Sequence, residues 1–254
     1  MMRRMGKLAM GLFVVVMLMG TLAQSAFASG EVALLKAYVY KYKFGYVGFS
    51  GDIEVLNSAY AKTVTVHYNP GNGTWYDTNA SYVGPTDASH EKWSFSIATD
   101  NINNAHPELS GLTSIEFAVK YEVNGQTYWD NNGGSNYTLG TSSSGPGYTL
   151  LGKPNVLAQY GFINGTSFYG NVTVKDLAYT KTVKIVYTTN NWVTTQEGYA
   201  TYSGEANGAG SVENWGFDFN VGSGVTQIKY AVSYTVNGQT YWDNNYGNNY
   251  TVTP

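Results

Sequence analysis

The ten-residue stretch VNGQTYWDNN occurs twice in this chain, at positions 123–132 and again at 236–245. In both places Asn-Gly stands between runs of residues that read as strands. Asn-Gly in this setting is a strong signal for a type I′ hairpin, because both central residues of that turn need a positive φ. The stretch therefore predicts a tight β-hairpin in each half of the chain.

The turn also fixes which face of the sheet each side chain occupies, because directly opposed residues point to the same side. Counting from Asn-Gly in the first half, Tyr121 faces Tyr128 on the apolar side. Trp129 then faces Lys120 on the polar side. The same count in the second half places Trp242 on the polar side. A large aromatic ring on each polar face is the first hint of a binding surface.

Three further matches in the same order show that the two halves are copies of one unit. They pair AYAKTV at 59–64 with AYTKTV at 178–183, ASY at 80–82 with ATY at 200–202, and WSF at 93–95 with WGF at 215–217. We expect one domain at 31–139 and a second at 155–254, each close to the size of a small β-sandwich. The segment 140–154 contains GTSSSGPG and predicts a flexible linker.

Alternation with a period of two runs through each copy. Ile115, Phe117 and Val119 alternate with Glu116 and Ala118, which is typical of a half-buried antiparallel strand. A helical period is not evident in any segment. The predicted fold is all-β, with two tandem β-sandwich domains.

Composition excludes several classes of protein. Among 254 residues only 12% are charged and 15% are aromatic, with 23 Tyr and 30 Gly, which suits a turn-rich β protein rather than a disordered chain. The net charge of -3 carries no footprint for nucleic acid or for an acidic membrane surface. The chain has no Cys, so disulfides, thiol catalysis and thiolate metal sites are excluded. Binding of a cofactor or metal is not expected, since the three His are scattered and the calcium-like Asp-x-Asn start lacks its remaining ligands.

The first residues have the pattern of a secretory signal peptide. Arg3, Arg4 and Lys7 precede an apolar run from position 8 to position 22, and small residues flank Phe27 at 26 and 28. The run is short for a membrane span. We expect cleavage near Ala28, a secreted chain and no membrane association after cleavage.

Each outward Trp is followed by a cluster of hydrogen-bonding side chains. The clusters are Asp130, Asn131, Asn132, Ser135, Asn136 and Tyr137 in the first copy, and Asp243, Asn244, Asn245, Asn248, Asn249 and Tyr250 in the second. A pyranose has an apolar CH face and a rim of hydroxyls, and Asn offers both a donor and an acceptor to such a rim. The pattern favours sugar binding, with turn chemistry alone as the other interpretation.

The order AYTKTVKIVYTTNNW, ATYSG, NWGFDF and VNGQTYWDNNYGNNY resembles carbohydrate-binding module family 21, a starch- and glycogen-binding domain. The resemblance covers nearly all of both copies. It implies an immunoglobulin-like β-sandwich, α-1,4-glucan polysaccharide as the ligand, and two sugar sites per domain.

The resemblance assigns residues to both sites. The first site would use Trp75, Trp129, Asn131 and Asn136 in the first copy and Trp192, Trp242, Asn244 and Asn249 in the second. The second site would use Tyr60, Lys62 and Tyr82, or Tyr179, Lys181 and Tyr202. Some members carry aromatic residues where this chain has Ala118 and Ala231 in the first site, and His90 and Val212 in the second.

A catalytic role is not expected. Glycoside hydrolysis usually needs two carboxylates that flank one bond, and no convincing pair stands out among 17 acidic residues. We therefore expect a secreted, non-catalytic, monomeric binder of α-glucans. Two alternatives remain open: a cell-surface immunoglobulin-like module for adhesion or protein interaction, and a targeting subunit for a separate amylolytic enzyme.

Overall fold

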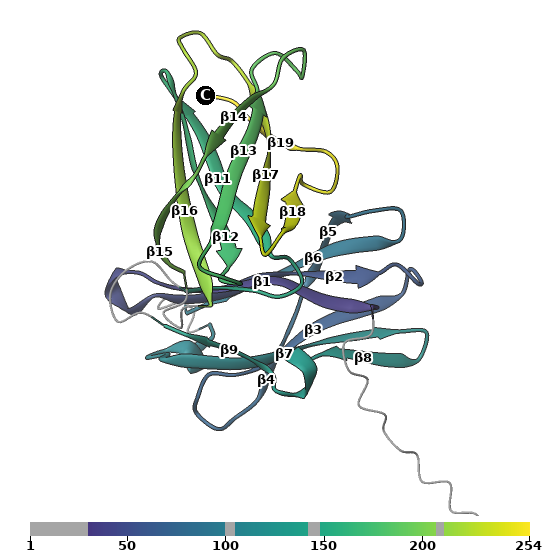
Figure 1. Ribbon diagram of the computed structural model, residues 1–254. Helices are drawn as coiled ribbons and strands as arrows, with labels where there is room; N and C mark the ends of the chain where they lie inside the picture. The colour runs from purple at the N-terminus through teal and green to yellow at the C-terminus, as the bar shows by residue number, and fades with distance from the viewer. Residues whose placement is uncertain (1–29, 100–104, 142–147, 207–210) are drawn as a thin grey trace, which may run out of the picture.

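The computed structural model describes residues 30–99, 105–141, 148–206 and 211–254, and Figure 1 shows them as two β-sandwiches. This confirms the predicted all-β fold with two tandem immunoglobulin-like β-sandwich domains. The predicted signal peptide, 1–28, lies outside the described residues. In the part of the chain that is described, no helix is long and apolar enough to cross a membrane, and no group of His, Cys, Asp and Glu could hold a metal ion.

The first domain packs two antiparallel sheets against each other. One sheet has the order β10-β1-β2-β6-β5, and the other has the order β4-β3-β7-β8 with β9 also paired to β7. The strands are β1 Val32–Lys41, β2 Val47–Leu56, β3 Lys62–Asn69, β4 Tyr76–Asn79, β5 Ser81–Pro85, β6 His90–Ala98, β7 Ser114–Val123, β8 Gln126–Asp130, β9 Tyr137–Gly140 and β10 Tyr148–Leu151. Three short 3-10 turns lie in the described loops of this domain: η1 Lys43–Gly45, η2 Pro107–Leu109 and η3 Asn132–Gly134.

The second domain repeats this arrangement with the sheets β11-β12-β16-β15 and β14-β13-β17-β18, and β19 also pairs with β17. Its strands are β11 Val156–Asn164, β12 Ser167–Lys175, β13 Lys181–Thr188, β14 Gln196–Tyr199, β15 Thr201–Glu205, β16 Val212–Asn220, β17 Ile228–Val236, β18 Gln239–Asp243 and β19 Tyr250–Val252.

Both hairpins have the predicted register. Tyr121 pairs with Tyr128 and Lys120 with Trp129 in the first domain, and Ser233 pairs with Trp242 in the second. The turn residues Asn124, Gly125, Asn237 and Gly238 all have positive φ. The alternating residues of β7 lie in the core as expected, because the inward set Ile115, Phe117, Val119, Tyr121 and Val123 is buried.

The Asp of the repeated stretch has a structural role in both copies. Asp130 is buried and accepts a hydrogen bond from the backbone N–H of Leu34, with a donor–acceptor distance of 2.6 Å, and from the Tyr137 hydroxyl at 2.9 Å. Asp243 accepts from Ala158 N–H at 2.7 Å and from the Tyr250 hydroxyl at 2.8 Å. These bonds tie the end of each hairpin to the first strand of the facing sheet.

The strand β10 lies within the segment 140–154 for which the sequence suggested a linker, whose residues 142–147 are outside the described part of the chain. β10 pairs with β1, and Thr149 N–H donates to the carbonyl of Ala206 in the second domain at 2.7 Å. Leu151 packs with Ala206, Val212 and Leu157 of the second domain. This short apolar strand therefore contacts both domains, and in Figure 1 the second domain stands on the sheet β10-β1-β2-β6-β5 of the first.

We predict that Asp130→Ala destabilises the first domain by about 2–4 kcal/mol, because the buried N–H of Leu34 and the buried hydroxyl of Tyr137 lose their hydrogen-bond acceptor. Asp218→Ala removes an exposed carboxylate and is the matched control, with little expected change. Urea unfolding followed by tryptophan fluorescence checks both. Equal midpoints for the two variants would show that Asp130 does not secure the hairpin.

Candidate functional site

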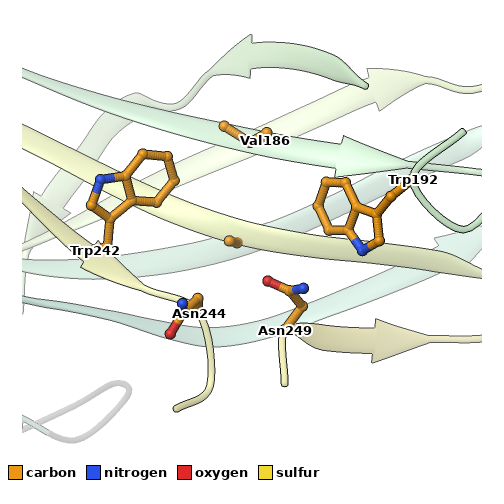
Figure 2. Close-up of a pocket in the computed structure, with 6 residues that line it drawn as sticks. Val186, Trp192, Trp242, Asn244 and Asn249 are labelled. Carbon is orange, nitrogen blue, oxygen red and sulfur yellow. The ribbon is translucent and has the colours of Figure 1, made fainter. Parts of the chain in front are cut away.

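An open cavity of about 550 Å³ lies on the outward face of the second domain, beside the hairpin. Figure 2 shows the indole rings of Trp192 and Trp242 on opposite sides of this space, with Asn244 and Asn249 along one edge. Val186 and Ala231 complete the lining. Trp242 is 55% exposed, which confirms that its ring points away from the core. The structure thus brings together all four residues assigned to the first site of this copy.

Several hydrogen bonds hold the loop that carries Trp192. Trp192 has φ 70, in the left-handed region that bulky residues rarely adopt. Its N–H donates to Thr188 Oγ1 at 3.0 Å, and Asn190 N–H donates to the same oxygen at 3.2 Å. Lys229 Nζ donates to Asn191 Oδ1 at 2.7 Å. These bonds stabilise a strained backbone that presents the indole ring to the cavity.

The loop between β18 and β19 positions the two amides in the same way. Asn244 Oδ1 accepts from Gly247 N–H at 2.9 Å, and Asn249 N–H donates to the carbonyl of Asn244 at 2.7 Å. Asn245 Nδ2 donates to the carbonyl of Asn249 at 3.2 Å. Asn244 and Asn249 therefore shape the loop and also line the cavity.

In the first domain the corresponding residues Trp75 and Trp129 pack against the imidazole of His67. His67 stands at the position of Val186, and its imidazole stacks on Trp75 with ring centroids 4.6 Å apart and an interplanar angle of 8°. The same imidazole meets Trp129 edge-on at 6.1 Å. Its Nδ1 lies 2.6 Å from Asp77 Oδ1. In this domain an imidazole thus covers one face of Trp75 and fills space between the two indoles.

One amide of the first domain is engaged differently. Asn131 Oδ1 accepts from Gly134 N–H at 3.0 Å, as Asn244 does from Gly247, but Asn136 Nδ2 donates to Glu116 Oε1 at 2.7 Å. Glu116 corresponds to Lys229 of the second domain, which bonds Asn191 instead. The first domain satisfies its Asn136 donor internally, whereas the second domain directs Asn249 to an open cavity.

The second predicted site is a cavity of about 860 Å³ in the first domain, whose lining includes Tyr60, Lys62 and Tyr82. Tyr60 is fully exposed, and Tyr82 meets the edge of Trp93 at 6.0 Å. Trp93 Nε1 donates to Glu91 Oε2 at 3.2 Å. The structure therefore adds Trp93 and Glu91 to the predicted residues.

The second domain repeats this cluster. Tyr179 is almost fully exposed, and Tyr202 meets the edge of Trp215 at 6.1 Å. Trp215 Nε1 donates to Glu213 Oε2 at 2.9 Å. Sequence analysis missed the two Trp–Glu pairs. The signal was present, because residues two apart on a strand share a face.

The lysines of this site are more buried than the sequence suggested. The side chain of Lys62 is 3% exposed, and Nζ bonds Asn57 Oδ1 at 2.6 Å and Glu91 Oε2 at 2.7 Å. Lys181 is equally buried and pairs with Asp176 and with Glu213. Burial opposes its charged form, but the bonds to Asp176 and Glu213 outweigh this and raise the pKa of Lys181. Both lysines hold carboxylates in place beneath the exposed tyrosines.

Comparison with known proteins identifies the family of this chain. The family model described as Carbohydrate/starch-binding module (family 21) matches residues 29–140 and 151–253. The chain belongs to this family. The resemblance noted in the repeated stretches is thereby confirmed, and each family 21 module coincides with one β-sandwich.

Individual relatives match one module at a time. Glucoamylase 1 of Rhizopus oryzae is 41% identical over 99 residues, which is 37% of this chain and 14% of the glucoamylase. Protein phosphatase 1 regulatory subunit 3B of Homo sapiens is 37% identical over 92 residues, which is 35% of this chain and 30% of that subunit. A solved structure of the starch binding domain of Rhizopus oryzae glucoamylase, in complex with beta-cyclodextrin and maltoheptaose, is 30% identical with a TM-score of 0.35, and covers 40% of this chain and 95% of that domain. This chain spans less than a third of the length of the two curated relatives.

We predict that Lys181→Met destabilises the second family 21 module by about 2–4 kcal/mol, because it leaves two carboxylates without their buried cation. Lys184→Met, which breaks a more exposed pair with Glu197, is the control with a change below about 1 kcal/mol. Because the pKa of Lys181 is raised, its contribution is complete below the ordinary value of 10.5 and is lost as the pH rises through the raised value. Thermal unfolding at pH 7 and pH 11 measures both effects, and equal losses at pH 7 for the two variants would contradict the buried role.

Proposed function

We propose that this protein binds α-1,4-glucans such as starch, glycogen and maltooligosaccharides. The observation that carries the proposal is the open cavity between Trp192 and Trp242, edged by Asn244 and Asn249. Flat indole rings suit the CH faces of glucose, and amides suit hydroxyls that donate and accept. Membership of the carbohydrate/starch-binding family supports the same ligand class.

The affinity of each single site for glucan is weak, and the presence of more than one site on the chain raises the overall avidity. A shallow surface cavity of this kind fits dissociation constants on the order of micromolar to millimolar. Two linked modules on one polymer raise the avidity by as much as about 10²–10⁴-fold where both reach it. The six residues that line the cavity carry no formal charge, so binding depends little on ionic strength.

The second domain is the stronger binder through its Trp192–Trp242 cavity. Its ring faces border an open space, whereas His67 covers a face of Trp75 in the first domain. The tyrosine site built on Tyr60 and Tyr82 gives the first domain a separate contact with glucan.

The protein acts without catalysis, as an exported monomer. No carboxylate is among the described residues that line the Trp192–Trp242 cavity, and hydrolysis of a glycosidic bond usually needs two. The basic start and the apolar run of the first 28 residues support export with cleavage near Ala28.

We predict that Trp242→Ala weakens binding to starch about tenfold or more, since it removes one wall of the open cavity. Trp129→Ala, the matched change in the first domain, has a smaller effect because that ring already packs against His67. Affinity electrophoresis in gels that contain starch, glycogen or cellulose compares both variants with the wild type. A wild-type protein that migrates unretarded through the starch gel would exclude the proposed function and favour an adhesion module.

We also predict that His67→Val opens the first domain, since it installs the residue that the second domain carries at Val186. In a Trp242→Ala background, this change restores starch retardation by about threefold to tenfold in affinity. His67→Phe keeps a ring against Trp75 and is the control, which gives no restoration. If the Val and Phe variants migrate alike, the imidazole is not what closes this site.

A further inference from the structure

A second cavity, of about 720 Å³, lies between the two domains and adjoins the Trp192–Trp242 cavity. Trp242 and Asn244 line both cavities, so the two spaces meet at these residues. The lining of the second cavity also includes Tyr246 from the β18–β19 loop and residues of the first domain.

Tyr246 occupies an unusual backbone position in the cleft. Its φ is 56, in the left-handed region, where a bulky residue costs about 1–3 kcal/mol. The first domain has Gly133 at the corresponding place, with φ 67, and glycine adopts this conformation without strain. A tyrosine kept at a position suited to glycine suggests that its side chain has a use.

Another part of the cleft lining belongs to the sheet β10-β1-β2-β6-β5 of the first domain. Lys36, Asp52, Glu54 and Lys92 point outward there and line the cleft. Asp52 lies 3.5 Å from Lys36 and 3.9 Å from Lys92, measured between carboxylate oxygen and Nζ. Desolvation, together with the nearby carboxylates of Glu54, Asp243 and Asp52, raises the pKa of Tyr246. The cleft thus offers an aromatic ring that stays a phenol donor, together with a row of charged donors and acceptors.

Contacts near the cleft hold the two domains in one arrangement. Thr149 of β10 bonds Ala206 across the interface, and Lys153 pairs with Glu54. Lys175 Nζ donates to the carbonyl of Gly152, so the second domain also grips the segment that follows β10. The charged wall and Tyr246 are therefore presented to a ligand together.

We propose that the interdomain cleft is an extended subsite for a glucan chain that is longer than the Trp192–Trp242 cavity holds. Tyr246 packs on a sugar face, and Asp52, Lys36 and Lys92 bond hydroxyls from the other domain. A neutral sugar fits this wall. The lysines of the wall donate to hydroxyl oxygens and its carboxylates accept from hydroxyl groups, and neither sign of charge dominates. The proposal rests on the proposed function and adds that binding strength depends on chain length through residues of both domains.

The test uses the full mature chain and calorimetric titration with maltotriose and with maltoheptaose. Tyr246→Gly restores the residue found in the first domain and relieves the strained backbone, so folding is not at risk. We expect it to weaken maltoheptaose binding about threefold to tenfold and to leave maltotriose binding unchanged. Asp52→Ala, in the other domain, is expected to give the same selective loss. Tyr42→Ala, which removes an exposed ring outside the cleft, is the control and changes neither affinity.

The outcomes separate this inference from the proposed function. A wild-type protein that binds neither sugar overturns the proposed function. A wild type that binds both, with Tyr246→Gly unchanged or weakened equally for both lengths, overturns the extended subsite alone. An unchanged maltoheptaose affinity for Asp52→Ala also overturns it, because the carboxylate of Asp52 is then not in contact with the ligand.

Discussion

The two-residue alternation of the hairpins β7–β8 and β17–β18, anchored by the Asn-Gly turns, is the constraint on which the other features depend. A shift of one residue would move every side chain of β8 or β18 to the opposite face. Tyr128 and Tyr241 would leave the cores, and Trp129 and Trp242 would enter them. The positive φ values at Asn124 and Asn237 hold the turns, and therefore hold the division between core and binding surface.

Features of short range were predictable from the sequence, and features of long range were not. The hairpin register, the outward Trp242 and the buried face of β7 follow from turn chemistry and alternation alone. The role of Asp130 was not predictable, because its donor Leu34 lies 96 residues away. The strand β10 was missed for the same reason: its partner is β1, and the composition of 140–147 alone is typical of a linker.

The site was predictable as a set of residues but not as a working surface. Trp75 and Trp129 match Trp192 and Trp242 in type and order, yet substitutions around them alter what they present. The first domain has His67 where the second has Val186, and Glu116 where the second has Lys229. These residues lie on strands β3, β7, β13 and β17, which become neighbours only when the chain folds. Whether an indole face is exposed or covered depends on the residues packed beside it. The sequence alone does not reveal which residues these are.

The contacts of β10 with both sandwiches have a consequence for how the two modules are oriented relative to each other. Two binding modules joined by a flexible linker can adapt to many spacings, whereas two modules held at one angle can bind together only where the ligand matches that angle. Here the contacts between the second domain and the segment around β10 include the backbone bond from Thr149 to Ala206, the apolar packing of Leu151, and the bond from Lys175 Nζ to the carbonyl of Gly152. The two family 21 modules are therefore presented in one mutual orientation, and any gain in avidity on a polymer depends on whether the polymer reaches both modules in that orientation.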